Sequence, residues 1–248
     1  MNITGIIIAK NEEKIIKNAI ESLDFCDEIL VIDNNSTDET AKTAEMLGAK
    51  VLKMDSWNFS ALRNFGKENA KGDLILYLDA DEIVSDELKK NIVSIVKQDK
   101  KASAYSLTRK NYYLGKNEWP KKEQITRLFL KEKLVGWKGT IHESPVVDGE
   151  IEKLGGNILH FTHRNLSQML KKTIEWSKAE AELKLAAKHP KMNLLRFFRV
   201  MAATFIDYYV KQKGYKLGTV GLIESIYQSF STFITYARLW EMQNKITK

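Results

Sequence analysis

Three carboxylates follow one apolar segment in the first half of the chain. The segment Leu74–Leu78 is apolar or aromatic throughout, and Asp79, Asp81 and Glu82 come directly after it. Such a run is typical of a strand that is buried on both faces of a parallel sheet. Clustered carboxylates repel one another unless a positive charge lies among them. Two carboxylates two positions apart on a turn can share one hard divalent cation with a diphosphate.

A structural interpretation of the same residues is the acidic start of a helix. Asp86 and Glu87 continue the acidic run, and carboxylates in a first helical turn are favoured by the helix dipole. An Asp-x-Asp pair by itself leaves both interpretations open. In open α/β sheets, ligands bind at the carboxyl ends of the strands, which is where Asp79 and Asp81 would lie.

The segments before this turn alternate between strand and helix patterns. Continuous apolar runs predict strands at 3–9, 28–32, 49–54 and 74–78. Apolar residues at helical spacing predict helices at 15–23, 40–47 and 60–70. This alternation indicates βαβ units and a parallel sheet of the nucleotide-binding type.

The predicted turns lack the usual glycine-rich phosphate motifs. Neither Gly-x-Gly-x-x-Gly nor Gly-x-x-x-x-Gly-Lys occurs there, which argues against a dinucleotide site and against a P-loop hydrolase. The first two strands end instead in polar residues, at Ala9–Glu12 and at Asp33. The Asp33 carboxylate could accept hydrogen bonds from a base or a ribose, or it could form an Asx turn that starts its loop.

The middle of the chain carries a second group of candidate residues. We predict a helix at 87–96, a loop over a cleft at 109–119, and strands at 104–108, 125–130 and 158–162. A loop at 136–145 combines glycines with a tryptophan and a His-Glu pair, which fits acid/base chemistry and sugar stacking, or an ordinary turn with an exposed histidine. His160 is a usable metal ligand, although a core histidine is the commoner case.

The composition is that of a soluble globular protein of one large domain, or of a domain with an extension. The chain has 248 residues, of which 44% are hydrophobic and 29% charged. Its one cysteine, Cys26, allows no intramolecular disulfide and no zinc site of the CxxC type. We expect no signal peptide, because the first residues lack a basic segment and a long apolar one. We also expect no membrane-spanning helix, because no window offers about 18 consecutive apolar residues.

The positive charge is concentrated in the last third of the chain. Residues 1–160 hold 24 Lys and Arg against 26 Asp and Glu, whereas residues 161–248 hold 15 against 6. We predict a long helix at 165–187, followed by two stretches with apolar stripes that begin at Leu194 and Ile223. Such stripes with basic flanks fit helices that lie in a membrane interface, or helices that pack on the rest of the protein.

Five short segments occur in a fixed order along residues 3–165. They are Ala9–Glu13, Val31–Asp38, Arg63-Asn64, Leu78–Glu82 and a Gly-x-x-His-Glu sequence at Gly139–Glu143. This ordered set, which is much more specific than any one motif, resembles the family 2 glycosyltransferases with a GT-A fold. Within that family it is similar to the lipopolysaccharide core-type glucosyltransferases. The helical end resembles the family's C-terminal extension more loosely.

The resemblance implies an α/β fold of the GT-A (Rossmann-like) type, with a mainly parallel sheet flanked by helices and an α-helical C-terminal extension. Residues 1–164 would form the nucleotide-sugar transferase domain and residues 165–248 the basic amphipathic extension. The implied activity is inverting transfer of a hexose, with UDP-glucose the favoured donor, to a cell-envelope glycan or glycolipid. The implied location is cytoplasmic and peripheral at the inner membrane face, where the basic extension favours an anionic acceptor.

The resemblance also implies roles for individual residues. Those that would hold the nucleotide sugar are Ala9, Lys10, Asn11, Glu12, Asp33, Arg63, Asp79 and Ala80. Those that would bind Mg²⁺ or Mn²⁺ are Asp81, Asp79 and His160. Those that would contact the acceptor or a phosphate are Arg127, Trp137 and His142. Inversion requires a base on the face of the sugar opposite the leaving group, and we expect Glu143 to be that base, with His142 and Glu82 as alternatives.

Two departures from the commoner family pattern affect the first two loops. The chain has Ala9-Lys10 where many members carry Pro and Tyr, which leaves the contact to the base there undetermined. It has Asn34-Asn35 where a Ser and a Gly are frequent. Neither departure touches the carboxylates that would hold the metal.

Two other classes of protein compete with the transferase interpretation. A nucleotidyltransferase also uses carboxylates and a metal on an α/β sheet, but it would normally bring a glycine-rich phosphate loop near the N-terminus. A non-catalytic protein that binds glycans or nucleotides at a membrane surface would not need Asp79, Asp81 and Arg63 together. A nucleic-acid partner is not expected, since the basic residues lie on apolar-striped helices without a recognition motif.

Overall fold

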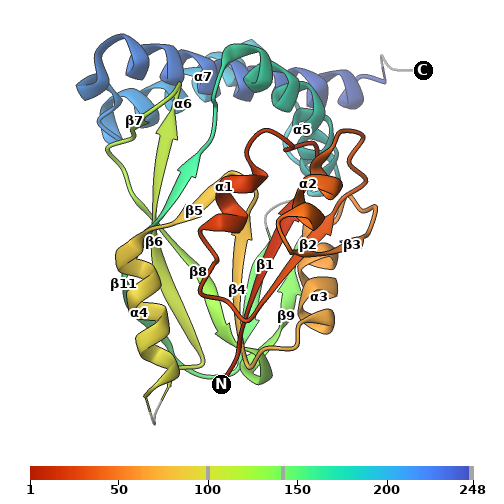
Figure 1. Cartoon of the computed structure of the whole chain (residues 1–248). Coiled ribbons are helices and arrows are strands. Elements are labelled where there is room, and N and C mark those ends of the chain that lie inside the picture. Colours follow the sequence, from red (N-terminus) through yellow and green to blue (C-terminus); the bar gives the residue numbers. More distant parts are fainter. Residues whose placement is uncertain (99–100, 141–142, 246–248) are drawn as a thin grey trace. The chain divides into compact units, whose positions relative to one another are not determined.

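The computed structural model describes residues 1–98, 101–140 and 143–245, in the arrangement of elements shown in Figure 1. The chain forms two compact units. The first comprises Met1–Lys110 and Lys122–His160, and the second comprises Asn111–Lys121 and Phe161–Lys248. The division falls within two long strands, β6 (Ala104–Tyr113) and β11 (Ile151–Phe161).

Four neighbouring strands of the first unit are parallel. They are β1 (Ile3–Ala9), β2 (Glu28–Asp33), β3 (Lys50–Lys53) and β4 (Leu74–Asp79), in the spatial order β3-β2-β1-β4. The helices between them are α1 (Ile16–Glu21), α2 (Thr40–Met46) and α3 (Phe59–Asn69). The predicted βαβ units are therefore confirmed, and their parallel register places the carboxyl ends of neighbouring strands at one edge.

Antiparallel strands continue the sheet beyond β4, in the order β4-β8-β6-β11-β5. The strand β8 (Glu123–Leu130) is antiparallel to both β4 and β6, and β5 (Glu82–Val84) is antiparallel to β11. The helix α4 (Asp86–Val96) begins after Ser85, whose hydroxyl accepts a hydrogen bond from the Leu88 amide. The helix-start interpretation therefore applies to Asp86 and Glu87, whereas Asp79, Asp81 and Glu82 precede the helix.

Two predicted loops contain strands instead. The loop predicted at 109–119 is wrong, because β6 continues to Tyr113 and pairs with β7 (Asn117–Glu118) after a turn. Leu114 and Gly115 form that turn with positive φ angles, and the mixed polar and aromatic sequence around it hides the alternation of a strand. The segment at 136–145 belongs largely to a hairpin of β9 (Leu134–Lys138) and β10 (Ser144–Val147), which follow the short 3-10 helix η1 (Lys131–Lys133).

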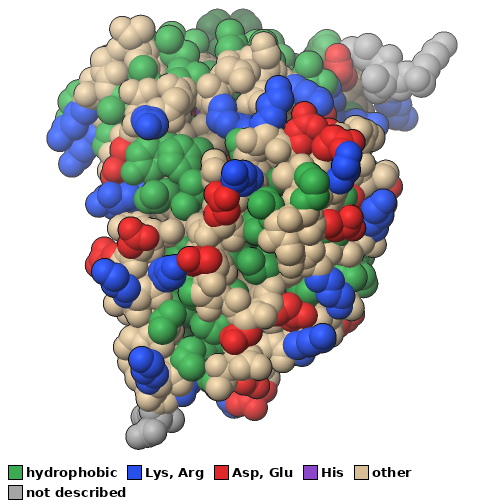
Figure 2. Space-filling view, in the orientation of Figure 1, with side chains coloured by type: hydrophobic (Ala, Val, Ile, Leu, Met, Phe, Trp, Pro, Cys, Tyr) green, Lys and Arg blue, Asp and Glu red, His purple; other side chains and the backbone are tan. Residues whose placement is uncertain are grey.

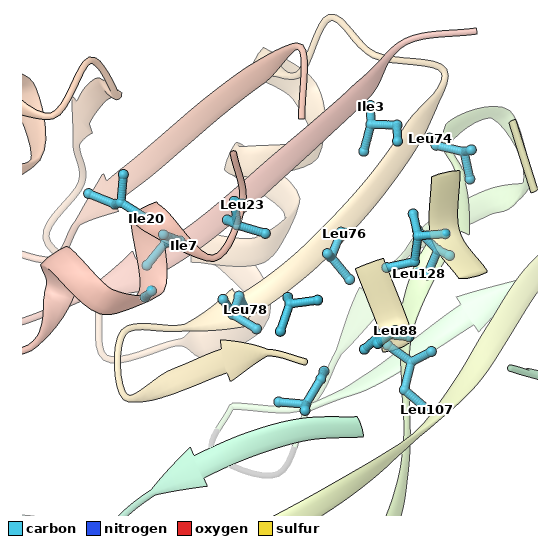
Figure 3. Packing of buried hydrophobic residues seen from close by; sticks show 14 of the residues in the cluster. Ile3, Ile7, Ile20, Leu23, Leu74, Leu76, Leu78, Leu88, Leu107 and Leu128 are labelled. Atoms are coloured by element: carbon cyan, nitrogen blue, oxygen red, sulfur yellow. The ribbon is translucent and has the colours of Figure 1, made fainter. Parts of the chain in front are cut away.

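The core of the first unit has two layers, because successive side chains of a strand point to opposite faces of the sheet. On one face Ile7, Leu76 and Leu78 pack with Ile20 of α1 and with Leu23, which follows α1, as Figure 3 shows. On the other face Ile6, Ile75 and Tyr77 pack with Leu62 of α3 and Trp137 of β9. Helices and the hairpin thus fix the strands from both sides, which makes the strand ends a rigid base for a site.

The second unit is mainly helical. Its elements are α5 (Leu166–Ala186), α6 (Leu194–Ile206), a π-helical segment η2 (Asp207–Lys211), a 3-10 segment η3 (Gly214–Leu217) and α7 (Gly218–Gln243). The helix predicted at 165–187 is confirmed as α5. Gly214 and Gly221 approach closely, since a Cβ on Gly221 would lie 1.8 Å from the Gly214 carbonyl oxygen. Among the described residues, no helix combines the length and apolarity needed to cross a membrane.

Candidate active site

The carboxyl ends of three neighbouring strands form the base of the candidate site. Ala9 of β1 lies opposite Asp33 of β2, and Ile8 of β1 lies opposite Asp79 of β4. Asp33 and Asp79 are therefore the last residues of strands that flank the same central strand. The parallel register alone brings these two predicted site residues to one edge of the sheet, as expected for a ligand crevice.

The loops after β1 and β2 are joined by hydrogen bonds. The Asn11 side-chain oxygen accepts from the Thr37 amide at 2.7 Å, and the Asn11 amide donates to the Ser36 hydroxyl at 3.0 Å. The Glu12 amide donates to the Thr40 hydroxyl at 2.8 Å. Asn11 has a φ of 55°, a left-handed conformation that asparagine tolerates better than most residues. The polar sequence after β1 thus shapes the loop, and Asn11 is engaged within the protein.

One carboxylate oxygen of Asp33 has no hydrogen-bond partner in the part of the chain that the structure describes. Its Oδ2 accepts from the Ser36 amide at 3.3 Å, so the carboxylate starts its loop as the turn interpretation expected. Its Oδ1 is buried and has no hydrogen-bond partner among the described residues, and the side chain is only 1% exposed. A buried acceptor without a partner costs about 1–3 kcal/mol unless water or a ligand satisfies it.

Arg63 of α3 connects two of the predicted carboxylates. Its Nε donates to Oε1 of Glu143 at 2.8 Å, and its Nη2 donates to Oδ1 of Asp79 at 2.9 Å. The side chain is 2% exposed, and its guanidinium carbon lies 4.9 Å from the centre of the Trp137 ring. Arg63 is therefore the positive charge that the acidic strand end requires, held between two carboxylates and an aromatic face.

Arg127 of β8 adds a second guanidinium to this cluster. Its Nη2 donates to Oδ2 of Asp79 at 3.3 Å, and its Nη1 lies 3.9 Å from Oε1 of Glu143. Its guanidinium carbon is 5.6 Å from the centre of the Trp137 ring. Within the described part of the chain, Nη1 of Arg63 and Nε of Arg127 are buried N–H groups without an acceptor.

The hairpin is fastened to α3 by Asn64, which follows Arg63. The Asn64 side chain accepts from the Trp137 amide at 2.8 Å and donates to the Trp137 carbonyl at 3.1 Å. The Phe59 amide donates to the Thr140 carbonyl at 3.0 Å, close before Glu143. This anchoring explains how Trp137 comes to lie against Arg63. It also explains how Glu143, the residue before β10, reaches a helix that is distant in sequence.

The charges of this cluster shift one another's protonation. Burial disfavours the charged form of Asp79, but the guanidinium groups of Arg127 and Arg63 outweigh burial and hold the pKa of Asp79 well below its usual range. Burial and the neighbouring charge of Asp79 raise the pKa of Glu82. Glu82 also accepts from the Asp79 amide at 2.9 Å and from Arg109 at 3.1 Å. Asp79 is therefore a fixed anion, and Glu82 is bound to the turn that carries Asp79.

Asp81 and His160 form a second group next to this cluster. The pairing of β5 with β11 sets Glu82 opposite His160, and Nε2 of His160 lies 3.4 Å from Oδ1 of Asp81. Burial disfavours the charged imidazole, yet the carboxylates of Asp81 and Glu82 outweigh it and raise the pKa of His160. A carboxylate and an imidazole at this separation fit a divalent cation whose other ligands are phosphate oxygens. No group of three or more His, Cys, Asp or Glu side chains in the described residues could hold a metal ion unaided.

The structure brings seven of the predicted residues into two neighbouring groups. Arg63, Asp79, Arg127, Trp137 and Glu143 form the first, with Trp137 buried beneath the guanidinium groups. Asp81 and His160 form the second group. Ala80, which lies between Asp79 and Asp81 in the sequence, is buried. His142 lies outside the described residues.

Sequence reasoning missed several side chains around the site. Arg109 binds Glu82 and also donates to Glu123 at 3.0 Å, so it neutralises the buried Glu82. Trp57, in the loop after β3, is largely exposed. The centre of its ring lies 4.9 Å from Nζ of Lys10. An arginine in a predicted loop and one tryptophan beside a helix carry no local pattern that would have identified them.

The sequence is similar to those of known glycosyltransferases. The model of glycosyl transferase family 2 matches residues 4–148. An uncharacterised glycosyltransferase of Rickettsia typhi is 30% identical over 260 residues, which cover 98% of this chain and 88% of that protein. The lipopolysaccharide core biosynthesis glycosyltransferase LpsC of Rhizobium meliloti is 24% identical over 253 residues, covering 96% of this chain and 92% of LpsC.

A solved structure shares the fold. The crystal structure of residues 1–349 of S. aureus TarS in complex with UDP-GlcNAc superposes with a TM-score of 0.50 at 12% identity, covering 100% of this chain and 93% of that one. At this identity the likeness concerns the fold alone.

Proposed function

Because the chain belongs to the family 2 glycosyltransferases and has an α/β GT-A fold, we propose that it transfers a hexose from a UDP-sugar with inversion. The acceptor in this proposal is a cell-envelope glycan or glycolipid. The kinship with LpsC, a lipopolysaccharide core biosynthesis glycosyltransferase by name, supports that class of acceptor.

The observation that carries the proposal is the order of groups along the carboxyl edge of the sheet. An unpaired carboxylate oxygen of Asp33 ends β2, and the Asp79–Arg63–Arg127–Glu143 cluster lies at the end of β4. Asp81 and His160 follow immediately. Along this edge, Asp33 offers a hydrogen-bond acceptor to a nucleoside, and Arg63 and Arg127 offer positive charge to a diphosphate. Glu143 offers a carboxylate to the hydroxyl group that receives the sugar.

The nucleotide end of the donor would lie against β1 and β2. Asp33 Oδ1 would accept a hydrogen bond from a base N–H or a ribose hydroxyl, which would satisfy an atom that has no partner among the described residues. The loop of Ala9–Glu12 borders this position, because the Asn34 amide donates to the Ala9 carbonyl at 2.8 Å. The unused N–H groups of Arg63 and Arg127 would serve the phosphates, for which guanidinium is well suited.

Asp81 and His160 would hold Mg²⁺ or Mn²⁺, with Asp79 beside them. Such an ion, when bound, offsets the negative charge that develops on the leaving diphosphate. The carboxylate of Asp79 is already neutralised by two arginines, so its part is to orient Arg63 and Arg127 and to contact the ribose.

Glu143 would act as the general base. As the acceptor oxygen bonds to the anomeric carbon and the bond from that carbon to the diphosphate breaks, the hydroxyl proton passes to a Glu143 oxygen. Nε and Nη2 of Arg63 both contact Oε1 of Glu143, and these two contacts leave Oε2 unused. Arg63 would thus fix the carboxylate while the other oxygen takes the proton.

We expect Asp33→Ala to weaken UDP binding about ten- to hundredfold, since a hydrogen bond to a charged group contributes about 1.5–3 kcal/mol. Calorimetric titration with UDP in the presence of Mn²⁺ measures the dissociation constant. Asp55→Ala is the matched control, because Asp55 is an exposed aspartate of the neighbouring loop whose carboxylate accepts from the Asn35 side chain at 3.0 Å. Equal affinity of the wild type and Asp33→Ala would remove Asp33 from the nucleotide site.

A further inference from the structure

Helices α6 and α7 run antiparallel. Phe197 lies against Phe233 with ring centres 5.6 Å apart, and the Ser229 hydroxyl donates to the Met201 carbonyl at 2.9 Å. Phe197 precedes Met201 in α6, whereas its partner Phe233 follows Ser229 in α7. The two helices therefore point in opposite directions. Helix α7, which follows the η2 and η3 segments, therefore returns along α6.

Both helices expose an apolar stripe on the same side of the pair. Phe198 follows the contact residue Phe197 by one position, and Phe230 follows Ser229 by one position, which is a rotation of about 100° in each helix. In an antiparallel pair this equal rotation carries both side chains to one side. The large exposed side chains on this side, named here the α6–α7 face, are Phe198, Ile223, Ile226 and Phe230. Phe198 is 65% exposed, Ile226 53% and Ile223 43%.

The buried side of α7 consists mainly of small and polar residues, with Leu239 as an apolar exception. It includes Gly221, Ser225, Ser229 and Thr235, together with Glu224 and Tyr227. The Ser225 hydroxyl donates to the Gly221 carbonyl at 2.7 Å, and the buried Tyr227 hydroxyl donates to the Met169 carbonyl of α5 at 2.6 Å. An amphipathic helix normally buries its apolar stripe. Here hydrogen bonds and close packing hold the inner side, and the apolar stripe is turned outward.

The charge around this face is positive. Residues 188–240 contain eight Lys and Arg against two Asp and Glu. Of those two, Glu224 is buried beside His163, and Asp207 accepts from the Gln212 side chain at 2.6 Å. The exposed cations of this part of the chain include Arg199, Lys211 and Lys213. Figure 2 shows hydrophobic and basic side chains interspersed on the helical unit.

We propose that the α6–α7 face lies in the interface of an anionic lipid bilayer. Phe198, Ile226 and Phe230 enter the boundary between head groups and acyl chains, while the flanking lysines and arginines contact lipid phosphates. Apolar side chains and cations on one surface match a bilayer of this kind in both chemistries. The proposal concerns residues that the candidate active site does not use, and it does not depend on the identity of the donor.

Vesicle co-sedimentation of the full chain tests the proposal. We expect binding to vesicles of phosphatidylglycerol and phosphatidylcholine, weaker binding at high salt, and little binding to vesicles of phosphatidylcholine alone. The double variant Phe198→Glu with Phe230→Glu should bind at least about a hundredfold more weakly, because each buried aromatic side chain contributes about tenfold or more. Met46→Glu is the matched control, since Met46 is 72% exposed on α2 of the first unit, and it should bind like the wild type.

A second variant separates loss of the surface from loss of folding. Lys211→Glu with Lys213→Glu changes only exposed residues and should reduce binding to anionic vesicles with an unchanged circular dichroism spectrum. Failure of the wild type to bind anionic vesicles would overturn the proposal. Binding of both double variants with the affinity of the wild type would overturn it as well. If light scattering instead showed a wild-type dimer that Phe198→Glu with Phe230→Glu makes monomeric, without vesicle binding, the face would be a contact between two copies.

Discussion

Glu143→Gln is expected to lower the turnover number by about 10²- to 10⁴-fold, the usual contribution of a general base. Glutamine keeps the size of the side chain and an oxygen that can accept from Arg63, so the cluster around Asp79 should persist. The change removes only the capacity to take a proton from the acceptor hydroxyl. The dissociation constant for UDP should therefore stay close to the wild-type value, which calorimetry checks alongside the rate of sugar transfer.

The same substitution separates two roles that the structure permits for Glu143. A residue that served only to hold Arg63 would tolerate glutamine, because the Nε–Oε1 hydrogen bond is kept. Glu150→Gln, at an exposed glutamate before β11, is the control for a change of charge and should transfer sugar at the wild-type rate. Near-normal turnover of Glu143→Gln would make Glu143 a positioning residue and leave Glu82 or His142 to be tested as the base.

Arg63→Met is expected to destabilise the protein by about 3–5 kcal/mol, the cost of removing one partner from a buried charge network. Asp79 and Glu143 would lose their closest cation, and Arg127 alone, at 3.3 Å and 3.9 Å from them, would compensate only in part. Since a domain is commonly stable by about 5–15 kcal/mol, denaturant unfolding should show a much lower midpoint. Transfer activity should be lost in the fraction that remains folded.

Two further variants show whether the loss is specific to the buried network. Lys17→Met breaks an exposed pair with Glu21 on α1 and should cost no more than about 1 kcal/mol. Arg63→Lys should still be destabilised, because an ammonium cannot reproduce the planar fork that contacts both carboxylates. If Arg63→Met unfolded at the wild-type midpoint, the four-charge cluster would not be a structural element of the site.

The parallel half of the sheet was predictable because its signals are local. Each of β1, β2 and β4 is a run of apolar residues, and the residue that ends each run lies at the edge where ligands bind. Asp33 and Asp79 could therefore be placed without any knowledge of long-range contacts. The ion pairs of Asp79 could not, because Arg63 reaches it from α3 and Arg127 from a strand far along the chain.

The antiparallel half depends on pairings that no local pattern encodes. The strand β5 has three residues, and its partner β11 comes much later in the sequence, yet their pairing is what brings His160 to Asp81. The stretch 109–119 was mistaken for a loop because its side chains do not alternate. In α7 the periodicity located the apolar stripe correctly. It left open whether the stripe was buried, since core helices and interface helices carry the same pattern.

The central claim is that the carboxyl edge of the sheet is a metal-dependent nucleotide site. Calorimetric titration of the full chain with UDP, GDP and ADP, each with Mn²⁺ and with excess chelator, tests it most directly. We predict that UDP binds in the presence of Mn²⁺, that the chelator abolishes binding, and that Asp81→Ala does the same. Absence of binding to all three nucleotides, or UDP binding that neither the chelator nor Asp81→Ala changes, would contradict the account.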